Sequence, residues 1–112
     1  MNDEERIYRW LSDLESTLQE AALLATRGVD AYRQDVALPL AFEALVNRVG
    51  DLAKRLVRAD AARFANPTWS SAARTRDFVV HHYDRIDAEL LWRTVTISFP
   101  RLLELVEAAQ RP

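Results

Sequence analysis

The chain has 112 residues, of which 49% are apolar and 29% charged, a balance typical of an ordinary globular domain. It contains no cysteine, which excludes disulfides and thiolate metal sites, and no apolar run near the roughly 18 residues of a membrane span. The formal net charge of −2 gives no overall attraction to nucleic acid, so any surface that faces RNA must be a local patch.

The few turn-forming residues favour long helices. Two glycines and four prolines argue against a β-meander and for helices with short connections. The start MNDEERIYRW is charged and lacks the continuous apolar stretch of a signal peptide. We therefore expect a single domain over residues 1–112, located in the cytoplasm.

The first predicted helix runs from Asp3 to about Leu24. Its apolar residues recur at steps of three and four and so share one face: Ile7, Leu11, Leu14, Leu18 and Ala21. Asn2 or Asp3 can cap its first turn, and Gly28 ends it where a left-handed residue is needed. Residues 29–38 form a mixed connector that has room for a helical turn of its own.

A second long helix is predicted from Pro39, since proline is acceptable in a first helical turn. Its apolar face consists of Phe42, Leu45, Val49, Leu52 and Leu56. Gly50 lies inside this helix, at a cost of about 1 kcal/mol against alanine. We interpret Gly50 as a place where a neighbouring helix approaches rather than as a break.

The third predicted helix follows the dipeptide Asn66-Pro67, which indicates a break because the residue before proline avoids the helical region. Ser70 or Ser71 offers an N-cap for this helix, which runs to roughly Val80. The segment HHYDRID then follows as a turn-like link.

The fourth predicted helix runs from about Asp87 to Gln110, and Pro100 should kink it. Its apolar face consists of Leu91, Val95, Phe99, Leu102 and Val106. Amphipathic helices with short links predict an all-α fold, an antiparallel four- to five-helix up-and-down bundle.

Both histidines of the chain fall in one segment, Arg76-Asp77-Phe78-Val79-Val80-His81-His82-Tyr83. Histidine exchanges protons near neutral pH, and arginine offers a planar fork of donors that fits a phosphate. Together they are the minimum set for RNA phosphodiester transesterification. His81 would take the proton of a ribose 2′-hydroxyl or protonate the leaving oxygen, and Arg76 would stabilise charge on the phosphate oxygens.

The spacing constrains how these residues can meet. On a straight helix Arg76 and His81 are about 140° apart and do not share a face, whereas Arg76 and Tyr83 nearly do. Either the helix ends before His81 and lets the imidazole swing back, or a second chain completes the site. We favour a two-fold dimer with the third and fourth predicted helices at its interface.

Each candidate also has an interpretation in which it only stabilises the fold. His81 can be a half-buried histidine, Arg76 with Asp77 a surface pair worth little, and Tyr83 an interface aromatic. We interpret Trp69 and Trp92 as packing residues. Five arginines could form a basic patch, although interleaved acids make a mixed face equally compatible: Arg63, Arg74, Arg76, Arg85 and Arg93. From the residues alone an enzyme, a non-catalytic binding module and a structural homodimer all stay open.

The pattern Arg-x4-His-x-Tyr, at Arg76, His81 and Tyr83, resembles the signature of the HepT-like branch of the HEPN superfamily. Residues 48–56 (RVGDLAKRL) are similar to the second-helix segment of that family. Residues 66–107 are similar to its Pro–Trp start, its motif helix and the opening of its last helix.

This resemblance implies a homodimeric helical bundle that acts as an endoribonuclease toxin, without metal or cofactor, with Arg76 and His81 catalytic. Asp77, His82 and Tyr83 would support the site. The implied partners are an RNA substrate and a nucleotidyltransferase antitoxin of the MNT type, which would silence the toxin by transferring AMP to Tyr83. That modification would place phosphate charge and bulk beside Arg76.

The sequence departs from the family pattern at four positions. Asp51 stands where glutamate is frequent, and Leu52 where alanine is frequent. His82 occupies a position that is commonly acidic, so it could share or replace the role of its neighbour. Asp77 stands where asparagine is frequent and would hold the Arg76 guanidinium while weakening its free charge.

Overall fold

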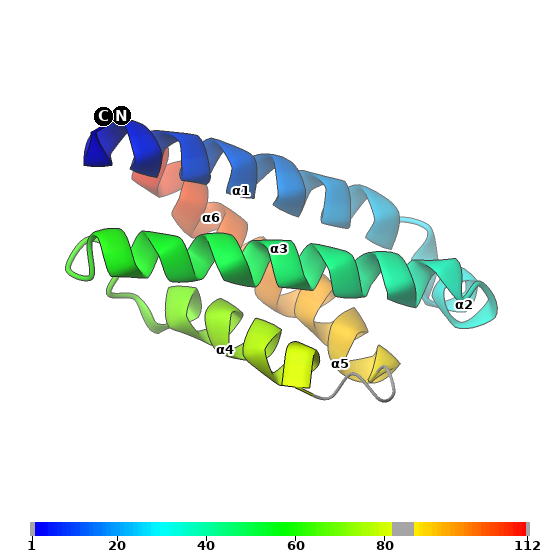
Figure 1. Ribbon diagram of the computed structural model, residues 1–112. Helices are drawn as coiled ribbons and strands as arrows, with labels where there is room; N and C mark the ends of the chain where they lie inside the picture. The colour runs from blue at the N-terminus through cyan, green and yellow to red at the C-terminus, as the bar shows by residue number, and fades with distance from the viewer. Residues whose placement is uncertain (1, 82–86, 112) are drawn as a thin grey trace.

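A computed structural model describes residues 2–81 and 87–111, which contain helices and no strand. The elements are α1 (Asp3–Ala25), α2 (Gly28–Gln34), α3 (Ala37–Ala59), α4 (Pro67–His81), α5 (Ala88–Arg93), the π-helical turn η1 (Thr94–Ser98) and α6 (Phe99–Gln110). The helices α1, α3, α4 and the run α5–η1–α6 alternate in direction, and α2 lies across one end (Figure 1). The predicted all-α antiparallel bundle is confirmed.

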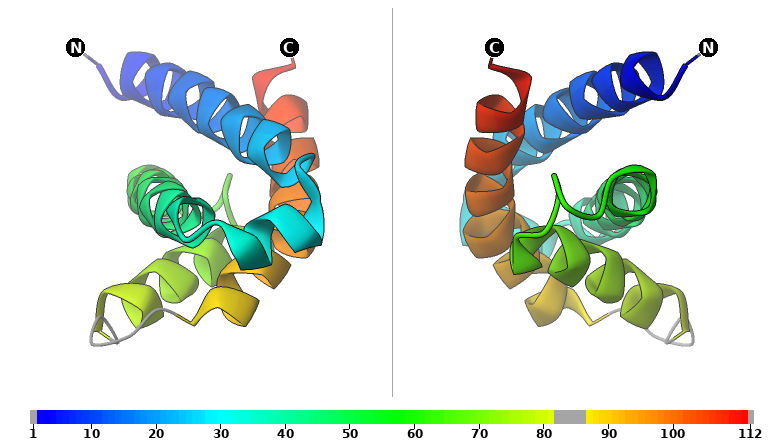
Figure 2. Two further views of the ribbon diagram at one scale, coloured as in Figure 1. Left: turned by 90° about the vertical axis from the view of Figure 1, so that its right-hand side faces the viewer. Right: turned by 90° about the vertical axis from the view of Figure 1, so that its left-hand side faces the viewer.

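The helix α3 lies at the centre of the bundle. It packs most extensively on α4 and α1, and it also contacts α2, α5 and η1. Figure 2 shows α3 between α1 on one side and α4 on the other. Every residue of the predicted apolar faces of the first and fourth helices is buried in the shared core. No helix in the described ranges is both long and apolar enough to cross a membrane.

The ends of the first helix agree with the sequence. The Oδ1 atom of Asn2 accepts a hydrogen bond from the backbone N–H of Glu5 at 2.8 Å. Gly28 has a φ of 90°, the left-handed conformation that was expected after this helix. The connector after Gly28 is more ordered than the sequence indicated, because it forms the short helix α2.

The start of α4 corrects a prediction. The cap is Asn66 rather than Ser70 or Ser71, since its Oδ1 accepts a hydrogen bond from the N–H of Thr68 at 3.0 Å. The helix therefore begins at Pro67, where the missing N–H of proline costs nothing because the first helical N–H has no intrahelical acceptor. The break indicated by Asn66-Pro67 is thus the helix start itself.

Tyr32 of α2 ties the end of the bundle together. Its ring lies 4.9 Å, centroid to centroid, from both Phe42 of α3 and Trp92 of α5. Its hydroxyl donates a hydrogen bond of 2.6 Å to the backbone carbonyl of Ala88. Burial, with a smaller effect of the nearby carboxylates of Glu89 and Asp87, raises the pKa of Tyr32 from 10.0 to about 12.

The disturbance expected at Pro100 takes the form of a π-helical turn. Pro100 has no N–H to offer the preceding turn, and its ring crowds that turn. The chain widens at η1, where the N–H of Phe99 donates to the carbonyl of Thr94, so the helix continues into α6. The hydroxyls of Thr94 and Thr96 donate 2.7 Å hydrogen bonds to carbonyls four residues earlier in the helix.

Gly50 is a point of close approach between α3 and α4, as predicted. A methyl group built on Gly50 would overlap the Cβ atom of Arg76 and come within 2.9 Å of the carbonyl oxygen of Ala72. Both neighbours belong to α4, and one of them is the arginine of the motif. The missing side chain at Gly50 therefore sets how closely the two helices pack.

We expect Gly50→Ala to destabilise the protein. Alanine stabilises a helix by about 1 kcal/mol relative to glycine, but overlap with the Cβ atom of Arg76 and with the carbonyl of Ala72 should cost about 3 kcal/mol, so the net loss is about 2 kcal/mol. Urea unfolding followed by circular dichroism measures it. Ala44→Gly, at an exposed position of the same helix, calibrates the propensity term alone. A Gly50→Ala variant more stable than the wild-type protein would contradict the close packing.

We expect Tyr32→Phe to lower the free energy of unfolding by about 1 kcal/mol at neutral pH, because the hydrogen bond to Ala88 is lost while the ring packing stays. Since the pKa of Tyr32 is raised when folded, its stabilising effect is complete below pH 10.0 and disappears as the pH rises through about 12. The difference in the free energy of unfolding between Tyr32→Phe and the wild-type protein should therefore become smaller at alkaline pH. Tyr8→Phe, at an exposed tyrosine, serves as the control and should show no such difference.

Candidate functional site

The side chain of Arg76 is held at its base and is partly exposed. The base of its side chain lies against Gly50, and its Nη1 atom is 3.3 Å from Oδ1 of Asp77. Its Nε atom is buried and has no hydrogen-bond partner in the described part of the chain. The whole side chain is 32% exposed. Arg76 is therefore a cation whose side chain is fixed at its base and whose Nη1 atom interacts with Asp77. Its Nε–H group has no acceptor among the described residues.

Asp77 engages the guanidinium of Arg76, as its charge suggested. This carboxylate is 41% exposed, so the attraction is screened by water and the pair contributes little to stability. The larger effect of Asp77 is on the binding of a phosphate. A carboxylate at this position competes with a phosphate for the same guanidinium.

The helix α4 continues through His81, so the alternative in which it ends earlier is wrong. No glycine or proline occurs between Pro67 and Pro100 to stop it sooner. Positions 76 and 81 are therefore about 140° apart on one continuous helix and do not share a face. His82 and Tyr83 lie outside the described residues.

The arginines do not form one common patch. Arg63 lies near the chain termini, where it donates a hydrogen bond of 3.0 Å to the carbonyl of Ala109 and approaches Glu4 at 3.7 Å. Arg93 donates to the carbonyl of Glu89, and Arg85 lies outside the described residues. Arg74 is exposed on α4.

The tryptophans pack in the core, as predicted. Trp69 is 3% exposed and meets Phe64 edge to face at 4.9 Å. The ring of Trp92 is stacked parallel to that of Phe42, with the centroids 6.0 Å apart. Their rings are engaged within the fold, which argues against a role as platforms for RNA bases.

The departures at the second-helix segment have structural roles. Asp51 forms an ion pair of 3.0 Å with Arg55, one turn further along α3. Leu52 is buried in the core.

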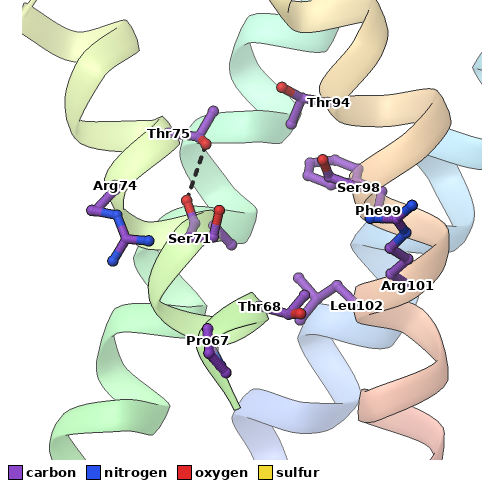
Figure 3. Close-up of a pocket in the computed structure, with 11 residues that line it drawn as sticks. Pro67, Thr68, Ser71, Arg74, Thr75, Thr94, Ser98, Phe99, Arg101 and Leu102 are labelled. Carbon is purple, nitrogen blue, oxygen red and sulfur yellow. Dashed lines mark hydrogen bonds between the residues drawn. The ribbon is translucent and has the colours of Figure 1, made fainter. Parts of the chain in front are cut away.

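A groove of about 320 Å³ separates α4 from the η1–α6 segment (Figure 3). Its two arginines stand on opposite sides, Arg74 on α4 and Arg101 on α6. Hydroxyl groups line much of the remaining surface. The lining residues are Pro67, Thr68, Ser71, Ala72, Arg74, Thr75, Thr94, Ser98, Phe99, Arg101 and Leu102. No pattern in the sequence predicts this groove, because its walls come from segments far apart in the chain.

Comparison with known proteins supports the resemblance. Residues 7–109 match the family described as HepT-like, Ribonuclease HepT-like. A protein of Caldanaerobacter subterraneus subsp. tengcongensis, named "Putative RNase", is 26% identical over 98 residues, which cover 84% of this chain and 88% of that protein. No solved structure matches the chain. Because the family match extends over nearly all of the chain and the fold is a helical bundle, this protein belongs to the HepT-like ribonuclease family of the HEPN superfamily.

Proposed function

We propose that this protein is the metal-independent endoribonuclease toxin of a HEPN/MNT toxin–antitoxin pair, with Arg76 and His81 as its catalytic residues. The observation that carries the proposal is the state of Arg76. Packing against Gly50 fixes the base of the side chain, and the side chain as a whole is 32% exposed, within a chain that belongs to a ribonuclease family. A positioned cation of this kind stabilises negative charge on a phosphate without reorganising.

In the proposed reaction His81 accepts the proton of the ribose 2′-hydroxyl, and the 2′-oxygen attacks the adjacent phosphorus. The bond from phosphorus to the 5′-oxygen breaks, and a protonated histidine returns a proton to that oxygen. Arg76 stabilises the charge on the two non-bridging oxygens during the exchange. His82, next in the chain, can serve as the second proton carrier. Asp77 holds Arg76 until the phosphate replaces it.

The register of α4 supports a site shared between two copies of the chain. Because positions 76 and 81 do not share a face of the helix, an arginine from one copy can meet a histidine from its partner across a two-fold axis. Exposed apolar side chains on the same elements favour such an interface. Phe78 of α4 is 44% exposed, and Ile97 of η1 is 51% exposed.

The proposed partner is a nucleotidyltransferase antitoxin of the MNT type that transfers AMP to Tyr83. Positions 76 and 83 are seven residues apart in the sequence, a spacing that returns nearly to the same face of a helix. A phosphate attached at Tyr83 would pair with the guanidinium of Arg76 and occupy the place of the RNA phosphate. Inhibition then follows from charge and bulk at one residue.

We expect Arg76→Ala and His81→Ala each to lower kcat/KM for RNA cleavage by about 100-fold or more, since each removes charge stabilisation or proton transfer. Induced expression in a bacterial host should arrest growth with the wild-type protein and not with either variant. Circular dichroism confirms folding, and Arg9→Ala on α1 is the matched control. If folded variants arrest growth equally, or if the purified wild-type protein leaves RNA intact, a non-catalytic binding subunit becomes the better description.

The same two variants test the shared site. If each site takes Arg76 from one copy and His81 from the other, mixing the inactive variants and allowing exchange should restore about a quarter of wild-type cleavage, because half of the dimers then hold one intact site of two. A chain that carries both Arg76→Ala and His81→Ala provides the negative control, because no dimer of that chain holds an intact site. No recovery in a mixture shown to form mixed dimers would place both residues of a site on one chain.

A further inference from the structure

We propose that the groove between α4 and the η1–α6 segment binds the phosphate backbone of the RNA strand beside the cleaved bond, with Arg74 and Arg101 contacting the phosphates. This inference rests on the proposed function for the identity of its ligand. Its support is separate, because none of the described residues that line the groove belongs to the Arg-x4-His-x-Tyr motif.

The first support for RNA binding is the charge of the groove. Two arginines line it and, among the described residues, no acidic one, although the whole chain has 17 acidic against 15 basic residues. Neither Arg74 nor Arg101 forms an ion pair within residues 2–81 and 87–111. Two arginines without an ion pair among the described residues, on opposite sides of the groove, make it a local positive patch of the kind that a chain of net charge −2 needs in order to bind RNA.

A second groove, on α1, has the opposite balance of charge. It lies along the start of α1 and is lined by Glu4, Glu5 and Asp13 together with Arg9. Its single arginine is surrounded by carboxylates, so its charge is cancelled locally. An RNA backbone would be repelled there and attracted between α4 and α6.

The hydroxyls supply the second step. Those of Thr68, Ser71 and Ser98 make no hydrogen bond within the described part of the chain and can donate to phosphate oxygens. The hydroxyl of Thr75 donates to the carbonyl of Ser71 at 3.0 Å, the dashed bond in Figure 3, and so keeps only its acceptor capacity. The result is a wall of donors beside the two guanidinium groups.

Placement along α4 supplies the third step. Arg74 and position 81 are seven residues apart, which on a helix is two turns, nearly the same face and about 10 Å along the axis. Pro67 and Thr68, at the positive end of the α4 dipole, also line the groove. A strand that reaches His81 and runs along α4 towards Pro67 would therefore pass Arg74 and then the start of the helix.

Contacts of this kind read charge and shape rather than bases. Arginine and hydroxyl contacts to phosphates position a strand and carry no sequence information. Trp69 is buried and the ring of Trp92 is stacked on that of Phe42, which argues against either as a platform for bases. We therefore expect the groove to favour longer single strands over short ones, and to show no preference among bases.

The test measures binding apart from cleavage. In a His81→Ala background, a fluorescent single-stranded oligoribonucleotide is titrated at several salt concentrations, with and without Arg74→Ala plus Arg101→Ala. We expect the double substitution to weaken binding about 10-fold and to reduce the salt slope by about 1.4, the value for two phosphate contacts on a single strand. Arg74→Lys plus Arg101→Lys should retain the slope, and Arg9→Ala is the control for the loss of one positive charge. Unchanged affinity and slope after loss of both arginines, or no binding by the parent, would overturn the proposal.

Cleavage by the otherwise wild-type protein separates the two proposals. There the double substitution should raise KM for a long RNA more than for a dinucleotide, since only the long strand reaches the groove. If RNA is cleaved with no length-dependent effect of the arginines, the groove assignment fails and the catalytic one stands. If binding depends on both arginines but no RNA is cleaved, the groove assignment stands and the catalytic one fails.

Discussion

The contact between Gly50 and Arg76 fixes the relation of the motif helix to the rest of the bundle. Because α4 packs mainly on α3, the separation of these two helices decides where every residue of α4 lies. A side chain at position 50 would force α4 outwards and take the base of Arg76 with it. At the other end of α4, Trp69 meets Phe64 and anchors the first turn. The missing side chain at Gly50 and the ring of Trp69 thus fix the position of α4, whose outer face is exposed.

The sequence was a good guide wherever the relevant physics is local. Steps of three and four placed the apolar faces of the long helices, because burial and helical periodicity act on the same residues. Gly50 was identified as a site of close approach because a helix tolerates glycine poorly without a packing reason. The predicted start of α4 is wrong, because Ser70 and Ser71 are also favourable N-cap residues, whereas the side chain of Asn66 makes the cap. The π-helical turn before Pro100 is one of several ways to accommodate a proline, and the sequence does not select among them.

The residues of the candidate site were likewise predictable only in part from the sequence. The motif arginine and histidine could be found from their chemistry, and the family resemblance gave them roles. Arg63 was grouped with them by proximity in the chain, yet its guanidinium lies at the far end of the molecule beside Ala109. No sequence pattern links Arg101 to the motif, because only folding brings α6 opposite α4 to form a groove. Long-range proximity of this kind depends on the bundle topology, which short patterns do not encode.

The open face of α4 has a consequence for the motions of the molecule. Trp69 is the only fully buried residue of α4 whose burial is described, whereas α3 contributes a whole row of them. The free energy needed to detach α4 from a single chain is therefore smaller than that needed to unfold α1, α3 and α6 together. Amide hydrogens of α4 would exchange with solvent through this partial opening, while those of α3 would exchange only when the whole domain unfolds. The helix that carries the motif is thus the part of the chain whose order gains most from a bound ligand or a second copy.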